Sequence, residues 1–194
     1  MTPRRRGRPP KSDETATKER LLDAAADACV ADGFESVTLA GIAERAGVTA
    51  TAIYNHFASR EELLYAAGRR ALDELAASMS PTLPGADAVH EIALAFIRPD
   101  SAPTRRLFLE LHLAGAHHPD LAVHLGEWHR EFAKLVGDVA PSEGSGGATV
   151  KALFLLLLGL CHLEDLDAIK AGPRAVRDHV VRLVDALYPT GGAA

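Results

Sequence analysis

The sequence predicts an all-α fold of about nine helices. Apolar residues recur at intervals of three and four through most of the chain, which is the period of a helix with one buried face. No segment alternates apolar and polar residues as a half-buried strand would. The 16 Gly and 11 Pro fall largely between the periodic segments, where these residues end helices. A chain of 194 residues has room for one large domain or two small ones.

The first helix is marked by an apolar stripe followed by a stop signal. Asp32-Gly33-Phe34 comes directly after the stripe, and glycine just past a periodic segment is typical of a helix end. The stripe consists of Leu21, Leu22, Ala25, Ala28 and Cys29.

Local capping signals predict both ends of the second helix. The Thr38 hydroxyl can accept a hydrogen bond from the first turn, and Gly47 can adopt the left-handed conformation that closes a helix. Between them, one face carries Leu39, Ile42, Ala43 and Ala46.

A third helix follows after a tight turn, with Thr49 as its expected N-cap. Ile53 and Phe57 are expected to face inward. The outer face then presents hydroxyl, phenol, amide and imidazole groups, which contact base edges and phosphates in DNA complexes. These outward residues are Thr51, Tyr54, Asn55 and His56. Residues 38–60 therefore predict a helix-turn-helix and a DNA-binding protein.

Six further helices are expected, the first of them opened by the capping box Ser59-Arg60-Glu61-Glu62. The eighth helix is apolar almost all round at its start, so we expect it to be buried on more than one side. A polar loop is expected at 141–147. The six helices are expected at about 60–80, 87–97, 104–115, 121–139, 149–170 and 176–187.

A basic arm precedes the helices. Residues 1–11 carry five basic side chains and no acid, although the whole chain has a net charge of −5. We expect residues 1–14 to be disordered without DNA, because the arm has no apolar content. Arg6-Gly7-Arg8-Pro9 resembles the core of the AT-hook, which lies in the minor groove of A·T-rich DNA. The alternative is a solvated tail that aids only non-specific association.

Residues 17–65 resemble the N-terminal domain of the tetracycline-repressor (TetR) family of bacterial regulators. The resemblance rests on RLLDAAADACVADGFESVTLAGIAERAGV, on Tyr54-Asn55-His56-Phe57 and on the segment from Ser59 to Leu63. It implies a helix-turn-helix domain at 15–62, a helical ligand-binding and dimerisation domain at 63–194, and a dimeric repressor that a small molecule releases from a palindromic operator in double-stranded DNA. With the arm, the DNA contacts implied are Arg4, Arg5, Arg6, Arg8, Thr38, Thr49, Ala50, Thr51, Tyr54, Asn55, His56 and Arg60.

The second domain supplies candidates for a ligand pocket and for a dimer interface. A dimer is also expected because one recognition helix reads only a few base pairs. The pocket candidates are Phe96, Phe108, Leu111, His112, Trp128, Phe132, Phe154 and His162. The dimer candidates, on the last two helices, are Leu153, Leu156, Leu160, Val176, Val180, Leu183 and Leu187.

Three other functions remain as alternatives. An architectural protein would use the arm and the helix-turn-helix on A·T-rich DNA with little sequence preference. A metal sensor is a weak alternative, because His124 and His129 are five apart, which places them about 140° apart around a helix. A hydrolase using His112, His117 and Asp120 is weaker still, because no nucleophile elbow or HExxH spacing is present. We therefore expect no enzyme activity, no metal and no cofactor.

The two cysteines and the longest apolar run indicate the compartment. Cys29 and Cys161 both lie in apolar helical segments, which is typical of small core residues in a reducing environment. Residues 152–161 form an apolar run about half as long as a bilayer span requires. We expect a cytoplasmic bacterial protein without a membrane partner, with a small-molecule effector that the sequence does not identify.

Overall fold

The computed structural model describes residues 11–77, 86–137, 146–164 and 173–187. In these ranges the chain forms nine α-helices and two short 3-10 helices, and no strand. The all-α prediction is therefore confirmed. The chain divides into two compact units, residues 1–67 and 68–194, and the boundary falls within helix α4, Arg60–Ala77. The domain boundary expected after residue 62 lies close to this division.

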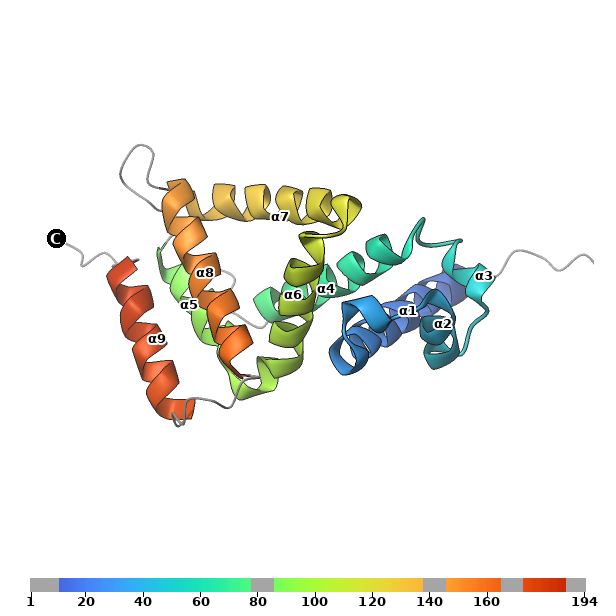
Figure 1. Cartoon of the computed structure of the whole chain (residues 1–194), viewed down its shortest axis with the longest axis horizontal. Coiled ribbons are helices and arrows are strands. Elements are labelled where there is room, and N and C mark those ends of the chain that lie inside the picture. The colour runs from blue at the N-terminus through green and yellow to red at the C-terminus, as the bar shows by residue number, and fades with distance from the viewer. Residues whose placement is uncertain (1–10, 78–85, 138–145, 165–172, 188–194) are drawn as a thin grey trace, which may run out of the picture. The chain divides into compact units, whose positions relative to one another are not determined.

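The first unit is built around the long helix α1, Lys11–Asp32, which packs against α2, Leu39–Ala46 (Figure 1). The 3-10 helix η1, Phe34–Ser36, and the short α3, Ala50–Ile53, complete it before α4 begins. The apolar stripe predicted for α1 is buried along its whole length. α1 begins at Lys11, so its first turn takes in residues that the sequence assigned to the arm.

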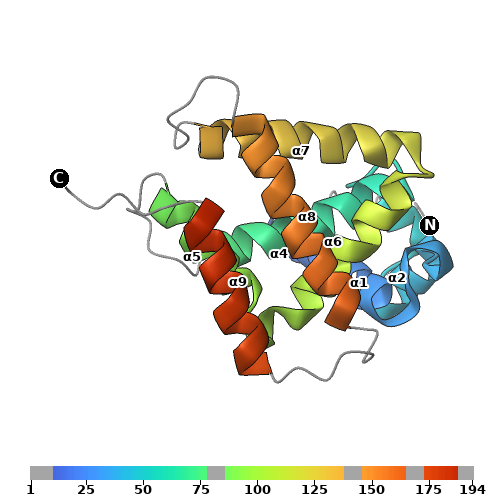
Figure 2. The same cartoon turned by 60° about the vertical axis from the view of Figure 1, so that its left-hand side comes forward.

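The second unit contains the rest of α4 and five more helices. α7 and α8 pack against one another, α8 also contacts α6, and α9 lies beside α5 in both views (Figure 1 and Figure 2). Side chains from these helices meet in one hydrophobic core, which includes Phe96, Phe108, Leu153, Phe154 and Val184. The helices are α5, Ala86–Phe96; α6, Ala102–Gly115; α7, Pro119–Gly137; α8, Gly146–Glu164; and α9, Pro173–Leu187; the 3-10 helix η2, Pro99–Ser101, precedes α6.

Two expectations about these helices were wrong in detail. α6 begins at Ala102 rather than near residue 104, because Pro103 fits the first turn, where its missing N–H has no partner to lose. α8 starts at Gly146, inside the expected loop at 141–147, whose earlier residues lie outside the described ranges. α8 buries Leu153, Leu157 and Cys161, yet its Leu155 side chain is 74% exposed, so the helix is not covered all round.

Both cysteines are buried thiols, one in each unit, and neither is part of a disulfide. Cys29 lies in the core of the first unit and Cys161 in that of the second, as the sequence indicated. No helix in the described ranges is long and apolar enough to cross a bilayer.

Candidate nucleic-acid interface and ligand cavity

The turn between α2 and α3 is held by the capping groups that the sequence predicted. The Thr38 Oγ1 accepts a hydrogen bond from the Gly41 N–H at 3.1 Å, which satisfies a donor of the first turn. Gly47 is left-handed, with φ of 64°, and its N–H and that of Val48 donate to the last carbonyls of α2. The chain therefore leaves α2 at a defined angle and enters α3 after three residues.

α3 is a single α-helical turn, shorter than the sequence suggested, and a hydrogen-bonded turn extends it to Phe57. The Phe57 N–H donates to the Ile53 carbonyl at 2.9 Å. Ile53 and Phe57 are buried, so they anchor this element in the first unit. Thr49 occupies the N-cap position of α3, as predicted, but its side chain makes no capping hydrogen bond.

The exposed side of the α3 element carries the polar groups that the sequence assigned to DNA. Ala50, Thr51, Tyr54 and Asn55 are exposed, and His56 is half-buried beside the Phe57 ring. Thr38 and Thr49 are exposed as well. Arg4, Arg5, Arg6 and Arg8 lie outside the described residues. A recognition helix needs exposed side chains that can donate hydrogen bonds and buried side chains that hold it in place, and the α3 element has both.

α4 opens with the predicted capping box, with one change in its bonding. The Ser59 Oγ accepts from the Glu62 N–H at 3.0 Å. The Glu62 carboxylate reaches back to the Ala58 N–H at 2.6 Å, one residue before the N-cap. These two bonds fix the chain between the α3 element and α4.

Arg60 is expected from the sequence to contact the DNA backbone, and in the structure its guanidinium is already engaged. Its Nη1 donates to the carbonyls of Phe34 and Val37, each at 3.0 Å. The guanidinium also lies over the Phe34 ring, 4.6 Å from the centroid, and its Nε pairs with Glu61. The side chain is 19% exposed. Because Val37 precedes the N-cap of α2, Arg60 ties the start of α4 to the start of α2.

Arg60→Lys tests whether this residue stabilises the first unit or only supplies a positive charge to the DNA backbone. A lysine keeps the charge but lacks the planar group that lies over Phe34 and the separate Nε donor to Glu61, so unfolding should become easier by about 1–2 kcal/mol. Thermal melting and DNA affinity would be measured together. Wild-type stability with unchanged DNA affinity would show that the position only supplies a charge.

The second unit holds a cavity of about 220 Å³ lined largely by aromatic rings, which we call the ring cavity. It lies between α4, α5, α6, α7 and α8. Five of the eight pocket candidates line it: Phe96, Phe108, Trp128, Phe132 and Phe154. The other three candidates do not line the cavity: Leu111 is buried, His112 is half-buried and His162 is exposed.

The charged edge of the ring cavity was missed by the sequence reasoning. Arg69 of α4 donates from Nε to the Asp73 carboxylate at 3.1 Å and from Nη1 to the Glu131 carboxylate of α7 at 2.9 Å. All three residues line the cavity. The spacing of Arg69 and Asp73, four apart on a helix, was a readable signal. Glu131 has no such signal, because it is 62 residues from Arg69.

Two histidines meet directly behind the ring wall. The Nε2 atoms of His112 and His129 are 2.9 Å apart, and His112 Nδ1 is 2.7 Å from the Phe108 carbonyl. Burial lowers the pKa of His112 to about 4 and also lowers that of His129. Neutral His112 therefore donates from Nδ1 to the carbonyl and accepts at Nε2 from His129. Within the described ranges, no three His, Cys, Asp or Glu side chains are grouped to hold a metal.

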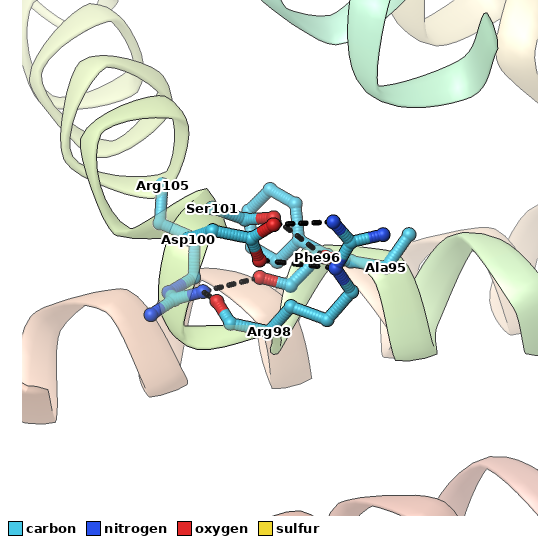
Figure 3. A network of polar contacts seen from close by, with 6 residues as sticks. All are labelled: Ala95, Phe96, Arg98, Asp100, Ser101 and Arg105. Atoms are coloured by element: carbon cyan, nitrogen blue, oxygen red, sulfur yellow. Dashed lines mark hydrogen bonds and ion pairs between the residues drawn. The ribbon is translucent and has the colours of Figure 1, made fainter. Parts of the chain in front are cut away.

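A buried arginine holds the end of α5, where Phe96 enters the cavity wall (Figure 3). Arg105 Nη1 donates to the carbonyls of Phe96 at 2.5 Å and Arg98 at 2.7 Å. The Ser101 Oγ donates to the Ala95 carbonyl at 2.7 Å. Arg98 forms an ion pair with Asp100 at the surface. Side chains of the following segment thus donate to the last two carbonyls of α5, those of Ala95 and Phe96, and to the carbonyl of Arg98 just beyond it.

An apolar groove runs between α8 and α9, and we call it the α8–α9 groove. Five of the seven dimer candidates line it: Leu156, Leu160, Val176, Val180 and Leu183. Leu153 is fully buried in the core of the unit, so its assignment to an interface was wrong. The side chain of Leu187 lies outside the described residues. Leu155 and Leu183, both on the groove, are 74% and 50% exposed.

Residues 21–67 match the model of the bacterial regulatory proteins of the tetR family. Two curated relatives from Pseudomonas putida, the helix-turn-helix transcriptional regulators SrpR and TtgW, are each 32% identical over 95 residues. That stretch is 49% of this chain, 45% of SrpR and 71% of TtgW. The chain thus aligns with less than half the length of the first relative.

The whole fold is shared with solved structures of low sequence identity. A TetR-family transcriptional regulator from Rhodococcus sp. superposes with a TM-score of 0.73 at 22% identity, covering 90% of this chain and 99% of that one. The multidrug binding protein EbrR, complexed with imidazole, superposes with a TM-score of 0.66 at 19% identity, covering 91% and 97%. These similarities extend over both units.

Proposed function

The chain belongs to the TetR family of bacterial transcriptional regulators, and we propose that it binds a palindromic operator as a homodimer and releases it when a small molecule fills the ring cavity. The observation that carries the proposal is the α3 element. It is anchored by buried Ile53 and Phe57 and presents Thr51, Tyr54 and Asn55 to the outside. Side chains of these types donate to phosphates and base edges in a major groove.

The α8–α9 groove supports the homodimer. It combines apolar lining residues with two large exposed leucines, a combination that a soluble chain seldom leaves uncovered. A two-fold dimer would bring two copies of the groove together as one self-complementary surface. Two recognition helices spaced by one DNA turn, roughly 34–36 Å, then read a site of useful length.

The ring cavity supports the response to a ligand. Its rings are apolar, and its edge carries a few charged groups, which is the usual composition of a small-molecule site. EbrR, which shares the fold, is a multidrug binding protein seen with imidazole. A ligand lowers operator affinity only if it binds more tightly to a dimer whose recognition helices no longer match successive major grooves.

Selection of bound fragments from random DNA at near-physiological salt tests this function. We expect one palindrome, bound about 10³-fold or more tightly than unrelated sequence. Asn55→Ala should relax the base preference at matching positions of both half-sites, because a bidentate amide contact to adenine contributes about 1–3 kcal/mol of discrimination. Diverse A·T-rich fragments without shared symmetry would instead indicate an architectural protein.

A further inference from the structure

The walls of the ring cavity are largely aromatic. Its five rings come from four helices, and their contacts are mostly edge to face. The Trp128 ring lies 5.5 Å from Phe108 at 76° and 5.4 Å from Phe154 at 74°. Ring faces carry the negative end of the aromatic quadrupole. A cation placed over such a face within about 6 Å is stabilised electrostatically.

The charged edge of the cavity adds to this preference. Among the described residues that line the cavity, Arg69 is the one base, and Asp73 and Glu131 are the two acids. Both carboxylates pair with the same guanidinium, so the edge carries one negative charge more than it carries positive. Glu131 and Asp73 are exposed, which leaves them accessible to a group that approaches the cavity.

The neighbouring histidines do not reverse this balance. His112 and His129 pack against Phe108 and Phe154 and are not among the residues that line the cavity. Because burial lowers the pKa of both imidazoles, they add no positive charge near neutral pH. An anion would therefore meet two carboxylates and find the arginine already paired.

We infer that the effector of the ring cavity is a small organic cation with an aromatic body, such as a protonated aromatic amine. This inference rests on the proposed function, since it names the ligand of that site. The body lies among the rings, and the ammonium group binds Glu131, where it takes the place of the Arg69 guanidinium. The volume of about 220 Å³ restricts the ligand to about one ring, because drug-sized ligands occupy clefts of roughly 300–1,000 Å³.

Three probes of similar size and different charge test the inference: phenethylammonium, phenylethanol and phenylacetate. Trp128 is the one tryptophan of the chain and lines the cavity, so its fluorescence reports binding without DNA. We expect saturable quenching by phenethylammonium, with an affinity about tenfold higher than that for either other probe. Equal affinity for phenylethanol, preference for phenylacetate, or no binding of any probe would overturn the inference.

A matched pair of variants locates the charge that matters. Glu131→Gln should weaken phenethylammonium binding about threefold and leave phenylethanol binding unchanged. Glu127→Gln, one turn earlier on α7 and outside the cavity lining, should leave the binding of both probes unchanged. Equal binding by Glu131→Gln and wild type would overturn the assignment of the ammonium to Glu131. Phenethylammonium binding that leaves operator affinity unchanged would confirm the ligand class and contradict only the proposed release.

Discussion

Leu155→Glu and Leu183→Glu are each expected to convert the proposed dimer to a monomer and to weaken binding to the proposed palindromic operator by about 10²–10⁴-fold. Both leucines lie on the α8–α9 groove and are exposed in the single chain. In the dimer a glutamate there would be desolvated opposite an apolar surface. A monomer binds one half-site, so it loses the effective concentration that links the two recognition helices.

Val123→Glu is the matched control for these variants. Val123 is 58% exposed on α7, between the two leucines in exposure, and is not part of the groove. The control should stay dimeric and keep wild-type operator affinity. Light scattering gives the mass, and fluorescence anisotropy of a labelled operator gives the affinity. Because both leucines are exposed in the single chain, circular dichroism should show an unchanged helical fold. Dimeric Leu155→Glu and Leu183→Glu proteins would place the interface on another surface.

Arg105→Ala should have the largest effect on stability. The guanidinium is buried, and its loss leaves the Phe96 and Arg98 carbonyls without this donor. Removing the charged donor from two such acceptors costs about 3 kcal/mol, which corresponds to a fall in melting temperature of roughly 10 °C. Thermal unfolding followed by circular dichroism measures it. Binding of phenethylammonium to the variant should also weaken, because the end of α5 carries Phe96 into the ring cavity.

Arg98→Ala provides the comparison on the same segment. Its side chain is exposed, and its ion pair with Asp100 is at the surface, where hydrogen bonding to Asp100 raises the pKa of Arg98. The carbonyl that Arg105 binds remains in this variant. We expect little change in melting temperature. Similar melting of Arg98→Ala and Arg105→Ala would contradict the role given to Arg105.

The helix-turn-helix was predictable because its signals are local. The Thr38 cap and the left-handed Gly47 involve groups within a few residues of one another, and both form as predicted. The capping box at Ser59 is of the same kind. Thr49 shows the limit of such signals, since it occupies the predicted N-cap position of α3 without forming the side-chain hydrogen bond. The engagement of Arg60 with Phe34, 26 residues earlier, could not be foreseen from local spacing.

Helical periodicity likewise identified apolar helices of the second unit, and it marked two of the cavity rings, Trp128 and Phe132. It did not distinguish among three destinations for an apolar side chain: core, cavity wall or groove. Leu153 lies in the core, while Leu155 and Leu156 line the groove. Successive residues point about 100° apart on a helix, so a small rotation about its axis exchanges these destinations. That rotation is set by packing against neighbouring helices.

Residue types and their spacing are thus sufficient for the helical class, the helix-turn-helix and its capping groups, because each depends on hydrogen bonds and contacts within a turn or two of chain. The charged edge of the ring cavity, the His112–His129 pair and the α8–α9 groove join residues from separate helices. Their partners are chosen by how the helices pack, and packing depends on the shapes of many side chains at once. For that reason the polar surface of the helix-turn-helix was predictable from the sequence, whereas the charges at the edge of the ring cavity followed only from the folded chain.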